Sequence, residues 1–209
     1  MAGSSAVLED ASLLSRLDRQ LLRLETVFAL ISGLAVFMLM FLAAYSVSGR
    51  KFFGSPLPGY VDWIETAMPF IAIMGVSYTQ RHGGHVRMDL LIGKLRGRAQ
   101  WLAELVSVLL ILVLMLALIW GSWSHFGRSF DFAAPLWSRD SSIDIGIPAW
   151  PAKLVVPVAF GVISLRLMLQ VWGYGRAFVL GLEAPVAVPL VQDAAAQAMA
   201  EAELMEGRG

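Results

Sequence analysis

Residues 26–48 read TVFALISGLAVFMLMFLAAYSVS and contain no charged side chain. A helix needs about 20 consecutive apolar residues to cross the roughly 30 Å hydrocarbon core of a bilayer. This stretch is long enough to cross, and it is too long for the apolar centre of a signal peptide. The sequence therefore predicts an uncleaved membrane-spanning helix near its start.

Three further apolar stretches follow, at about residues 63–80, 105–124 and 150–172. The chain is 57% hydrophobic and 15% charged, whereas charged residues make up about a quarter of a soluble domain. We therefore expect an all-α integral membrane protein whose residues 26–176 form a domain of four spans. We expect residues 177–209, which are rich in Ala and Glu, to be a mobile cytoplasmic tail.

Residues 1–25, which precede the first span, end in an amphipathic pattern. Apolar side chains recur there every three or four residues and continue into the span, at Leu14, Leu17, Leu21, Leu24 and Phe28. Polar and charged side chains fill the positions between them. This pattern predicts an amphipathic helix that lies on the inner membrane surface before it enters the first span.

A second interfacial amphipathic helix is predicted between the second and third spans. The sequence His82-Gly83-Gly84-His85 makes a turn there. The segment after it alternates apolar and charged side chains with helical spacing; the apolar ones are Met88, Leu91, Ile92, Leu95 and Leu102. This helix would face anionic lipid on the cytoplasmic side.

Basic residues indicate the orientation, because Lys and Arg near helix ends are retained on the cytoplasmic side during insertion. The segments before the first span and between the second and third spans carry eight of them: Arg16, Arg19, Arg23, Arg81, Arg87, Lys94, Arg96 and Arg98. The two opposite loops carry five: Arg50, Lys51, Arg128, Arg139 and Lys153. We therefore expect both termini in the cytoplasm.

Composition excludes several kinds of chemistry. The chain has no cysteine, so disulfides, thiolate metal sites and cysteine nucleophiles are absent, and its formal net charge is zero. A neutral chain has no overall basic field to attract nucleic acid. We also find no Ser/His/Asp set and no phosphate-binding glycine loop, so we expect no enzyme, no catalytic residue and no cofactor.

Two acidic residues stand at the start of the second predicted span. Asp62 and Glu65 have the spacing of a capping box, with a carboxylate in place of the usual N-cap hydroxyl. The alternative is a carboxylate pair that faces a partner or an ion. Arg166, inside the fourth predicted span, also has two interpretations: its side chain extends to the inner interface, or it pairs with a buried carboxylate.

The three histidines raise the possibility of a haem-binding anchor, in which imidazoles from neighbouring spans hold iron. The predicted topology argues against it, because His82 and His85 follow the second span on the inner side and His125 follows the third on the outer side. About 30 Å of hydrocarbon would separate them. A surface metal site at His82 and His85 is the weaker alternative to a simple turn, and we expect no metal.

The order of motifs resembles the small membrane subunit of tripartite ATP-independent periplasmic (TRAP) transporters. The resemblance rests on a Pro-rich outer loop, Tyr60-Val61-Asp62-Trp63-Ile64-Glu65, Gly75, Arg81-His82-Gly83-Gly84-His85-Val86-Arg87-Met88-Asp89 and Ile147-Pro148-Ala149-Trp150-Pro151. It covers about residues 16–176. The final predicted helix, with Pro157 and Gly161, fits the same pattern.

The resemblance implies a function in the bacterial inner membrane. In this family a large membrane subunit carries substrate and sodium and moves like an elevator, while the small subunit packs against its static scaffold. A periplasmic binding protein delivers the substrate, usually a carboxylate. The predicted partners are thus the large subunit, the binding protein and lipid, and the predicted partner-interface residues are Asp62, Trp63, Glu65, Arg81, His85, Asp89, Trp150 and Arg166.

Overall fold

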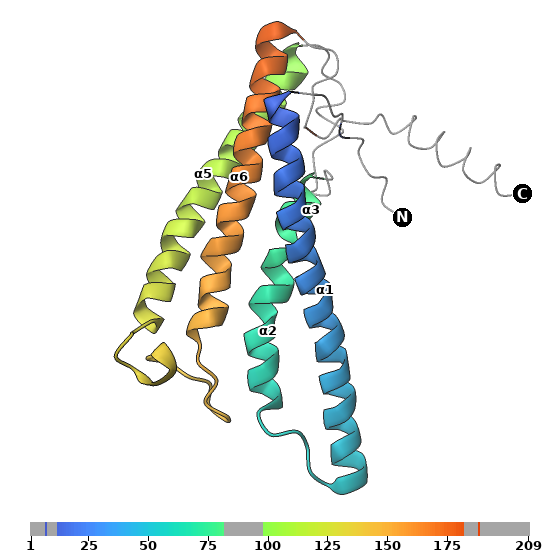
Figure 1. The fold of residues 1–209 in the computed structure, drawn as a ribbon, viewed down its shortest axis with the longest axis vertical. Coiled ribbons are helices and arrows are strands. Elements are labelled where there is room, and N and C mark those ends of the chain that lie inside the picture. Colours follow the sequence, from blue (N-terminus) through green and yellow to red (C-terminus); the bar gives the residue numbers. More distant parts are fainter. Residues whose placement is uncertain (1–6, 8–11, 82–97, 182–187, 189–209) are drawn as a thin grey trace, which may run out of the picture. The chain divides into compact units, whose positions relative to one another are not determined.

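The computed structural model describes residue 7, residues 12–81, residues 98–181 and residue 188. The helices are α1 (Leu13–Phe53), α2 (Tyr60–Met74), α3 (Val76–Arg81), α5 (Arg98–Ser129) and α6 (Trp150–Leu180), and a short 3-10 helix, η1 (Pro135–Trp137), lies between the last two (Figure 1). The predicted all-α class is confirmed. The second interfacial helix, the turn around His82 and most of the tail lie outside the described residues.

Three of the helices, α1, α5 and α6, are long and apolar enough to cross a membrane. They contain the predicted spans 26–48, 105–124 and 150–172 and extend beyond each of them. The predicted span 63–80 is built differently, because α2 ends at Met74 and α3 begins after Gly75. The 15 residues of α2 reach only about 22 Å, so a fourth span stays a prediction.

The amphipathic segment before the first span continues into that span as one helix. Helix α1 runs without a break through 41 residues, a length of about 60 Å. The polar side chains of its first turns are not all directed to water, since Ser15 and Asp18 are buried. Packing against other helices, and not the membrane surface, therefore accounts for part of this polar face.

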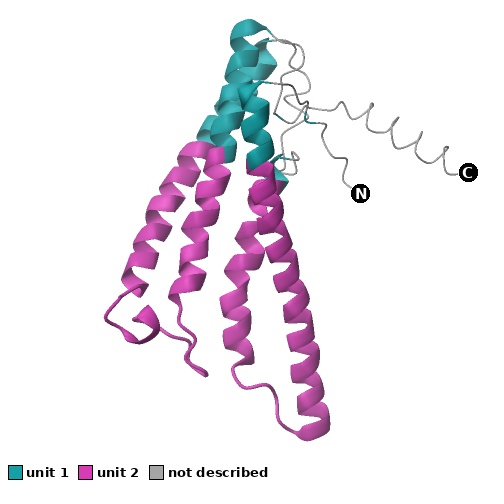
Figure 2. Cartoon of the chain, viewed as in Figure 1, with its two compact units in different colours: residues 1–20, 79–111, 166–209 teal, residues 21–78, 112–165 magenta. Residues whose placement is uncertain are grey.

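The chain forms two compact units, which Figure 2 distinguishes by colour. Unit 1 comprises Met1–Gln20, Thr79–Ile111 and Arg166–Gly209. Its interior combines apolar and aromatic side chains with charged ones: Trp101 of α5 stacks on Tyr174 of α6 with ring centroids 6.2 Å apart, and both are buried. Among the buried polar residues of this unit are Asp18, Gln80, Arg81, Glu104, Arg166 and Gln170.

Unit 2 comprises Leu21–Tyr78 and Leu112–Leu165. Its helices expose many large apolar side chains, and no residue of the most hydrophobic 18-residue window of α1 is buried. Such surfaces are stable next to lipid tails or another apolar helix and unstable next to water. Its buried polar side chains include Glu25, Ser46, Asp62 and Ser77.

The turn between α1 and α2 depends on a glycine. Gly59 is the N-cap of α2 and has φ 66, a left-handed conformation that residues with a side chain rarely adopt. A Cβ atom at this position would lie 2.6 Å from the Ile145 side chain. Gly59 therefore allows the loop between α5 and α6, residues 130–149, to lie against the start of α2.

Candidate functional site

A buried ionic cluster lies in unit 1, where three helices each supply one charged side chain. Asp18 of α1 accepts hydrogen bonds from Arg81 of α3, with Arg81 Nη2 2.7 Å from Asp18 Oδ2 and Arg81 Nε 3.3 Å from the same oxygen. The other carboxylate oxygen, Oδ1, forms an ion pair with Nη1 of Arg166 of α6. The side chains of Asp18, Arg81 and Arg166 are 1%, 8% and 0% exposed.

This cluster decides between the two interpretations of Arg166. Its side chain is paired with a buried carboxylate, as the alternative predicted, and it does not extend to the interface. Removing two opposite charges from water is costly, and close pairing with satisfied hydrogen bonds offsets that cost. Sequence analysis missed Asp18, because its position among the arginines of the first turns suggests a solvent-facing helix surface.

An amide pair adds to the polar interior of unit 1. Gln80 donates to Gln170 Oε1 through its Nε2 atom, at 3.0 Å, and both side chains are buried. Gln170 follows Arg166 by one helical turn on α6, and Gln80 directly precedes Arg81 in α3. The two helices that supply arginines to the cluster are thus also joined by an amide hydrogen bond.

In unit 2, α1 binds both parts of the interrupted second predicted span. The Ser32 hydroxyl donates to the carbonyl oxygen of Ile71 in α2, at 2.9 Å. In an uninterrupted α-helix this carbonyl would accept a hydrogen bond from the N–H of Gly75, four residues later. The Ser77 hydroxyl of α3 donates to Glu25 Oε1 of α1, at 2.5 Å. The Ser32 and Ser77 side chains therefore attach α1 to the helices on both sides of Gly75.

Asp18, Glu25 and Ser32 share a signal that could have been read from the sequence. They are spaced by seven residues along α1, which is about two helical turns, so they lie on one face of that helix. Polar residues repeated at this spacing along one face of a membrane helix indicate a face that packs against protein. The apolar positions of the same segment do not reveal this repeat, which appears only when the polar positions are compared.

Asp62 does not cap the helix that contains it, so the capping-box prediction was wrong. The N-cap of α2 is Gly59, and no side chain caps the helix. Asp62 lies in the first turn, and its Oδ2 atom accepts hydrogen bonds from the backbone N–H groups of Asp144 and Ile145, at 3.0 and 2.9 Å. The carboxylate therefore fixes the α5–α6 loop against α2, and it is buried there.

The other acidic residue, Glu65, is exposed. It lines a cavity of about 330 Å³ in unit 2, together with Asp62, Thr66, Ser142 and Lys153. Lys153 forms an ion pair with Asp140 at the edge of this region. Trp63, between the two acids, is 46% exposed. The two acids predicted to act together thus differ in environment. Asp62 is buried and binds the α5–α6 loop, whereas Glu65 is exposed.

The α5–α6 loop is held by its own charged groups. The N–H of Ala133 donates to Asp131 Oδ1 at 3.0 Å, and Arg139 Nε donates to Asp131 Oδ2, also at 3.0 Å. The Ala133 N–H and, next, the Arg139 side chain lower the pKa of Asp131 below its ordinary value. The Lys153 ammonium likewise lowers the pKa of Asp140. Both carboxylates are therefore charged at neutral pH.

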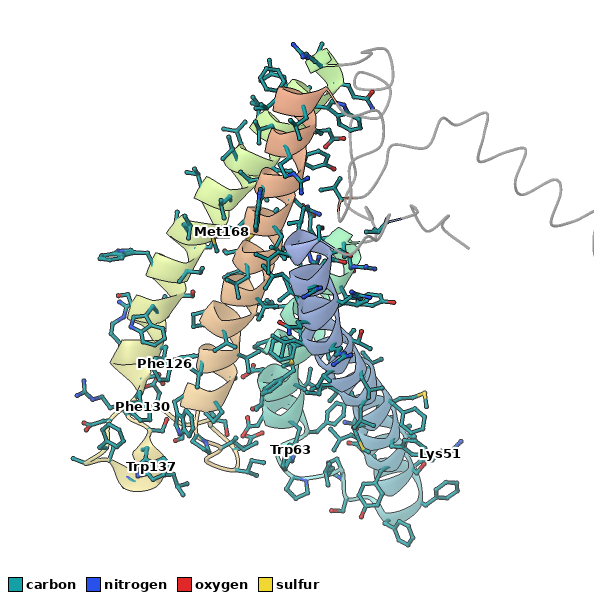
Figure 3. The ribbon with its side chains drawn as sticks, turned by 45° about the horizontal axis from the view of Figure 1, so that its top comes forward. Lys51, Trp63, Phe126, Phe130, Trp137 and Met168 are labelled. Atoms are coloured by element: carbon teal, nitrogen blue, oxygen red, sulfur yellow. The ribbon has the colours of Figure 1, made fainter. Side chains whose placement is uncertain are left out.

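Trp150, a predicted interface residue, is the first residue of α6 and packs against this loop. Its indole N–H donates to the carbonyl of Leu136 at 3.0 Å, and its ring lies edge-on to Phe130 with centroids 5.5 Å apart. Figure 3 shows Phe126, Phe130 and Trp137 near this end of α5. The remaining predicted interface residues, His85 and Asp89, lie outside the described residues. Within residues 12–81 and 98–181, no group of three or more His, Cys, Asp or Glu side chains is placed to hold a metal ion.

Comparison with known proteins identifies the family. Residues 39–175, about two thirds of the chain, match the family described as tripartite ATP-independent periplasmic transporters, DctQ component. No individual curated protein matches the chain. The matched region includes α2, α5 and most of α6, and thus the acids of α2 and the loop that Asp62 fixes. The protein is therefore a membrane transport component that belongs to the DctQ family, the small permease subunits of TRAP transporters.

Proposed function

We propose that this chain braces the large membrane subunit of a TRAP transporter and carries no substrate itself. The observation that supports this proposal is that charged side chains are paired in the interior while apolar side chains are exposed. Three buried charged side chains, one each from α1, α3 and α6, bind one another in the Asp18 cluster, whereas many large apolar side chains of α1 and α5 are exposed. Carriers need polar groups that can bind a passing solute, and a brace needs an apolar surface to pack on.

In this proposal the large subunit binds the substrate and couples its uptake to sodium. The substrate is a carboxylate that a periplasmic binding protein delivers, as the family resemblance implies. The moving part of the large subunit needs a frame that stays fixed in the bilayer. The small subunit widens that frame, with both termini in the cytoplasm of a bacterium and its membrane domain in the inner membrane, as the distribution of Lys and Arg favours.

The proposed contact with the large subunit now includes Trp63 and Glu65. Asp62, Arg81 and Arg166 are bound within the chain, and their side chains have little exposed surface for a partner. Trp63 and Glu65 stand at the start of α2 and remain exposed. An exposed indole beside a carboxylate suits a partner surface that offers an apolar patch and a basic group.

Purification in a mild detergent tests this assignment. We expect the tagged chain to bring down a large multi-span membrane protein, and we expect Trp63→Ala together with Glu65→Gln to reduce its yield. Trp172→Ala, which changes an exposed indole of α6 outside the proposed contact, is the matched control. A chain that purifies alone from cells that express the large subunit would contradict the proposal. The family match favours this function over the haem-binding anchor.

A further inference from the structure

Exposed aromatic side chains gather at one end of unit 2. They come from the end of α1, the start of α2, the last third of α5 and the loop after it: Phe52, Phe53, Trp63, Trp120, Trp123, Phe132 and Trp137. The connections place these segments at the same end. Residues 54–59 join α1 to α2, and the bonds from the N–H groups of Asp144 and Ile145 to Asp62 hold the α5–α6 loop against α2. Figure 3 shows Lys51, Trp63 and Trp137 toward this end.

The most exposed part of this group is the aromatic turn, residues 130–138. Phe132, Leu136 and Trp137 are 79%, 70% and 53% exposed. An indole, a phenyl ring and a leucine side chain that project from a polar loop into water are unfavourable, because burying each of them would release ordered water. The turn is therefore built to meet an apolar environment.

The backbone of the aromatic turn is held in an uncommon conformation. Leu136 and Trp137 have φ 52 and 58, a region that bulky residues rarely adopt. The Trp150 indole N–H donates a hydrogen bond to the Leu136 carbonyl, at 3.0 Å, and the N–H of Asp131 donates to the Trp137 carbonyl, at 3.1 Å. Strain that the surroundings maintain in this way suggests a function for the presented side chains.

Four of the charged side chains around the turn form two ion pairs. Arg139 pairs with Asp131 and Lys153 pairs with Asp140. These charged groups can stay in the hydrated headgroup layer, while the side chains of Phe132, Leu136 and Trp137 extend from that layer to the acyl chains. Since the charges are already paired, contact with a membrane would depend on the apolar side chains and would depend little on anionic lipid or salt.

We propose that the aromatic turn is a membrane-interface anchor, in which residues 130–138 lie in the phospholipid headgroup layer and the side chains of Phe132, Leu136 and Trp137 contact the acyl chains. A lipid surface fits better than a protein partner for two reasons. Apart from Trp63, which the proposed function assigns to the large subunit, the exposed aromatic side chains come from three segments at one end of the unit, as an aromatic belt requires. The turn also directly continues α5, a helix that is long and apolar enough to span a membrane and that exposes Trp120 and Trp123.

The anchor goes beyond the proposed bracing function and does not depend on it. Because the chain has no cysteine, single spin labels can be attached to the full chain without other changes. We would label Phe132→Cys and Leu136→Cys separately, with Ser141→Cys, an exposed polar position of the same loop, as the control. Each variant is reconstituted in nanodiscs of phosphatidylcholine, and collision rates with oxygen and with a water-soluble nickel complex are measured.

We expect a severalfold higher ratio of oxygen to nickel collisions at positions 132 and 136 than at position 141, and the same ratio when anionic phosphatidylglycerol or salt is added. Labels at 132 and 136 that meet the nickel complex as freely as the control would overturn the proposal. Labels that lose contact with both reagents only after the large permease subunit is added would overturn it too, and would assign the turn to a protein partner.

Discussion

Asp18 and Arg166 lie 148 positions apart in the sequence, and their side chains form an ion pair inside unit 1 with almost no exposure to water. Arg81 completes the cluster from α3. A carboxylate between two guanidinium groups joins three helices at one point. Such a cluster adds less to stability than its charges suggest, because desolvation opposes their attraction, but removing one member leaves the others uncompensated.

Asp18→Asn should therefore destabilise the chain strongly. Removing one partner of a buried ion pair costs about 3–5 kcal/mol, and this variant leaves two arginines side by side. Equilibrium unfolding in mixed micelles measures the effect. Arg19→Gln, which neutralises an exposed neighbour on α1, should stay within about 0.5 kcal/mol of the parent chain. Equal stability of the two variants would show that the cluster contributes nothing.

Ser32→Ala should weaken the attachment of α1 to α2, because the Ile71 carbonyl loses its hydroxyl partner. Hydrogen bonds between helices in a membrane contribute about 0.6 kcal/mol on average and about 1.7 kcal/mol at most. The same unfolding measurement should detect a loss within that range. Ser48→Ala, an exposed hydroxyl of the same helix, is the control. If both variants unfold alike, the hydroxyl does not stabilise the interrupted span.

Asp62→Ala should loosen the α5–α6 loop without unfolding the helices. The carboxylate binds two backbone N–H groups, and hydrogen bonds to a charged group contribute about 1.5–3 kcal/mol. The amides of Asp144 and Ile145 should then exchange with deuterium about tenfold faster or more. Glu65→Ala should leave both exchange rates unchanged, because Glu65 is exposed. Unchanged rates in Asp62→Ala would mean that other contacts hold the loop.

Acid should release the contact between Asp131 and Ala133. Since the pKa of Asp131 is lowered in the folded chain, chiefly by the Ala133 N–H, the charged carboxylate stabilises the loop at neutral pH. That contribution is lost as the pH falls from the ordinary value of 3.8 through the lower folded-state pKa. The amide resonance of Ala133 should shift with a midpoint below 3.8, and Arg139→Gln should raise this midpoint. A midpoint at or above the ordinary value would contradict the lowered pKa.

Hydrophobic runs predicted the helical class and three of the spans, because length and composition alone decide what can cross a bilayer. They did not locate the break at Gly75. Proline commonly bends or ends a helix, but α2 continues through Pro69 and ends at Met74. The Ser32 hydroxyl, which binds the carbonyl of Ile71 near the break, comes from a different helix, so local sequence gives no sign of it.

The candidate site was predicted less well for the same reason. Spacing showed that Asp62 and Glu65 begin α2, but only the folded chain brings Ser142, Asp144 and Ile145 to Asp62. Arg166 was recognised as a charge inside a span, with a buried carboxylate as one possible partner. The identity of that carboxylate, Asp18, required the packing of α1 on α6, which periodicity does not specify.

Reconstitution in sealed vesicles tests most directly whether this protein braces a carrier or is one. Vesicles that hold this chain alone should show no uptake of carboxylate and no sodium flux, under gradients that drive uptake once the large subunit and the loaded binding protein are added. Vesicles with the large subunit but without this chain should take up substrate more slowly than the complete system. Solute or sodium flux through the isolated chain would contradict the account.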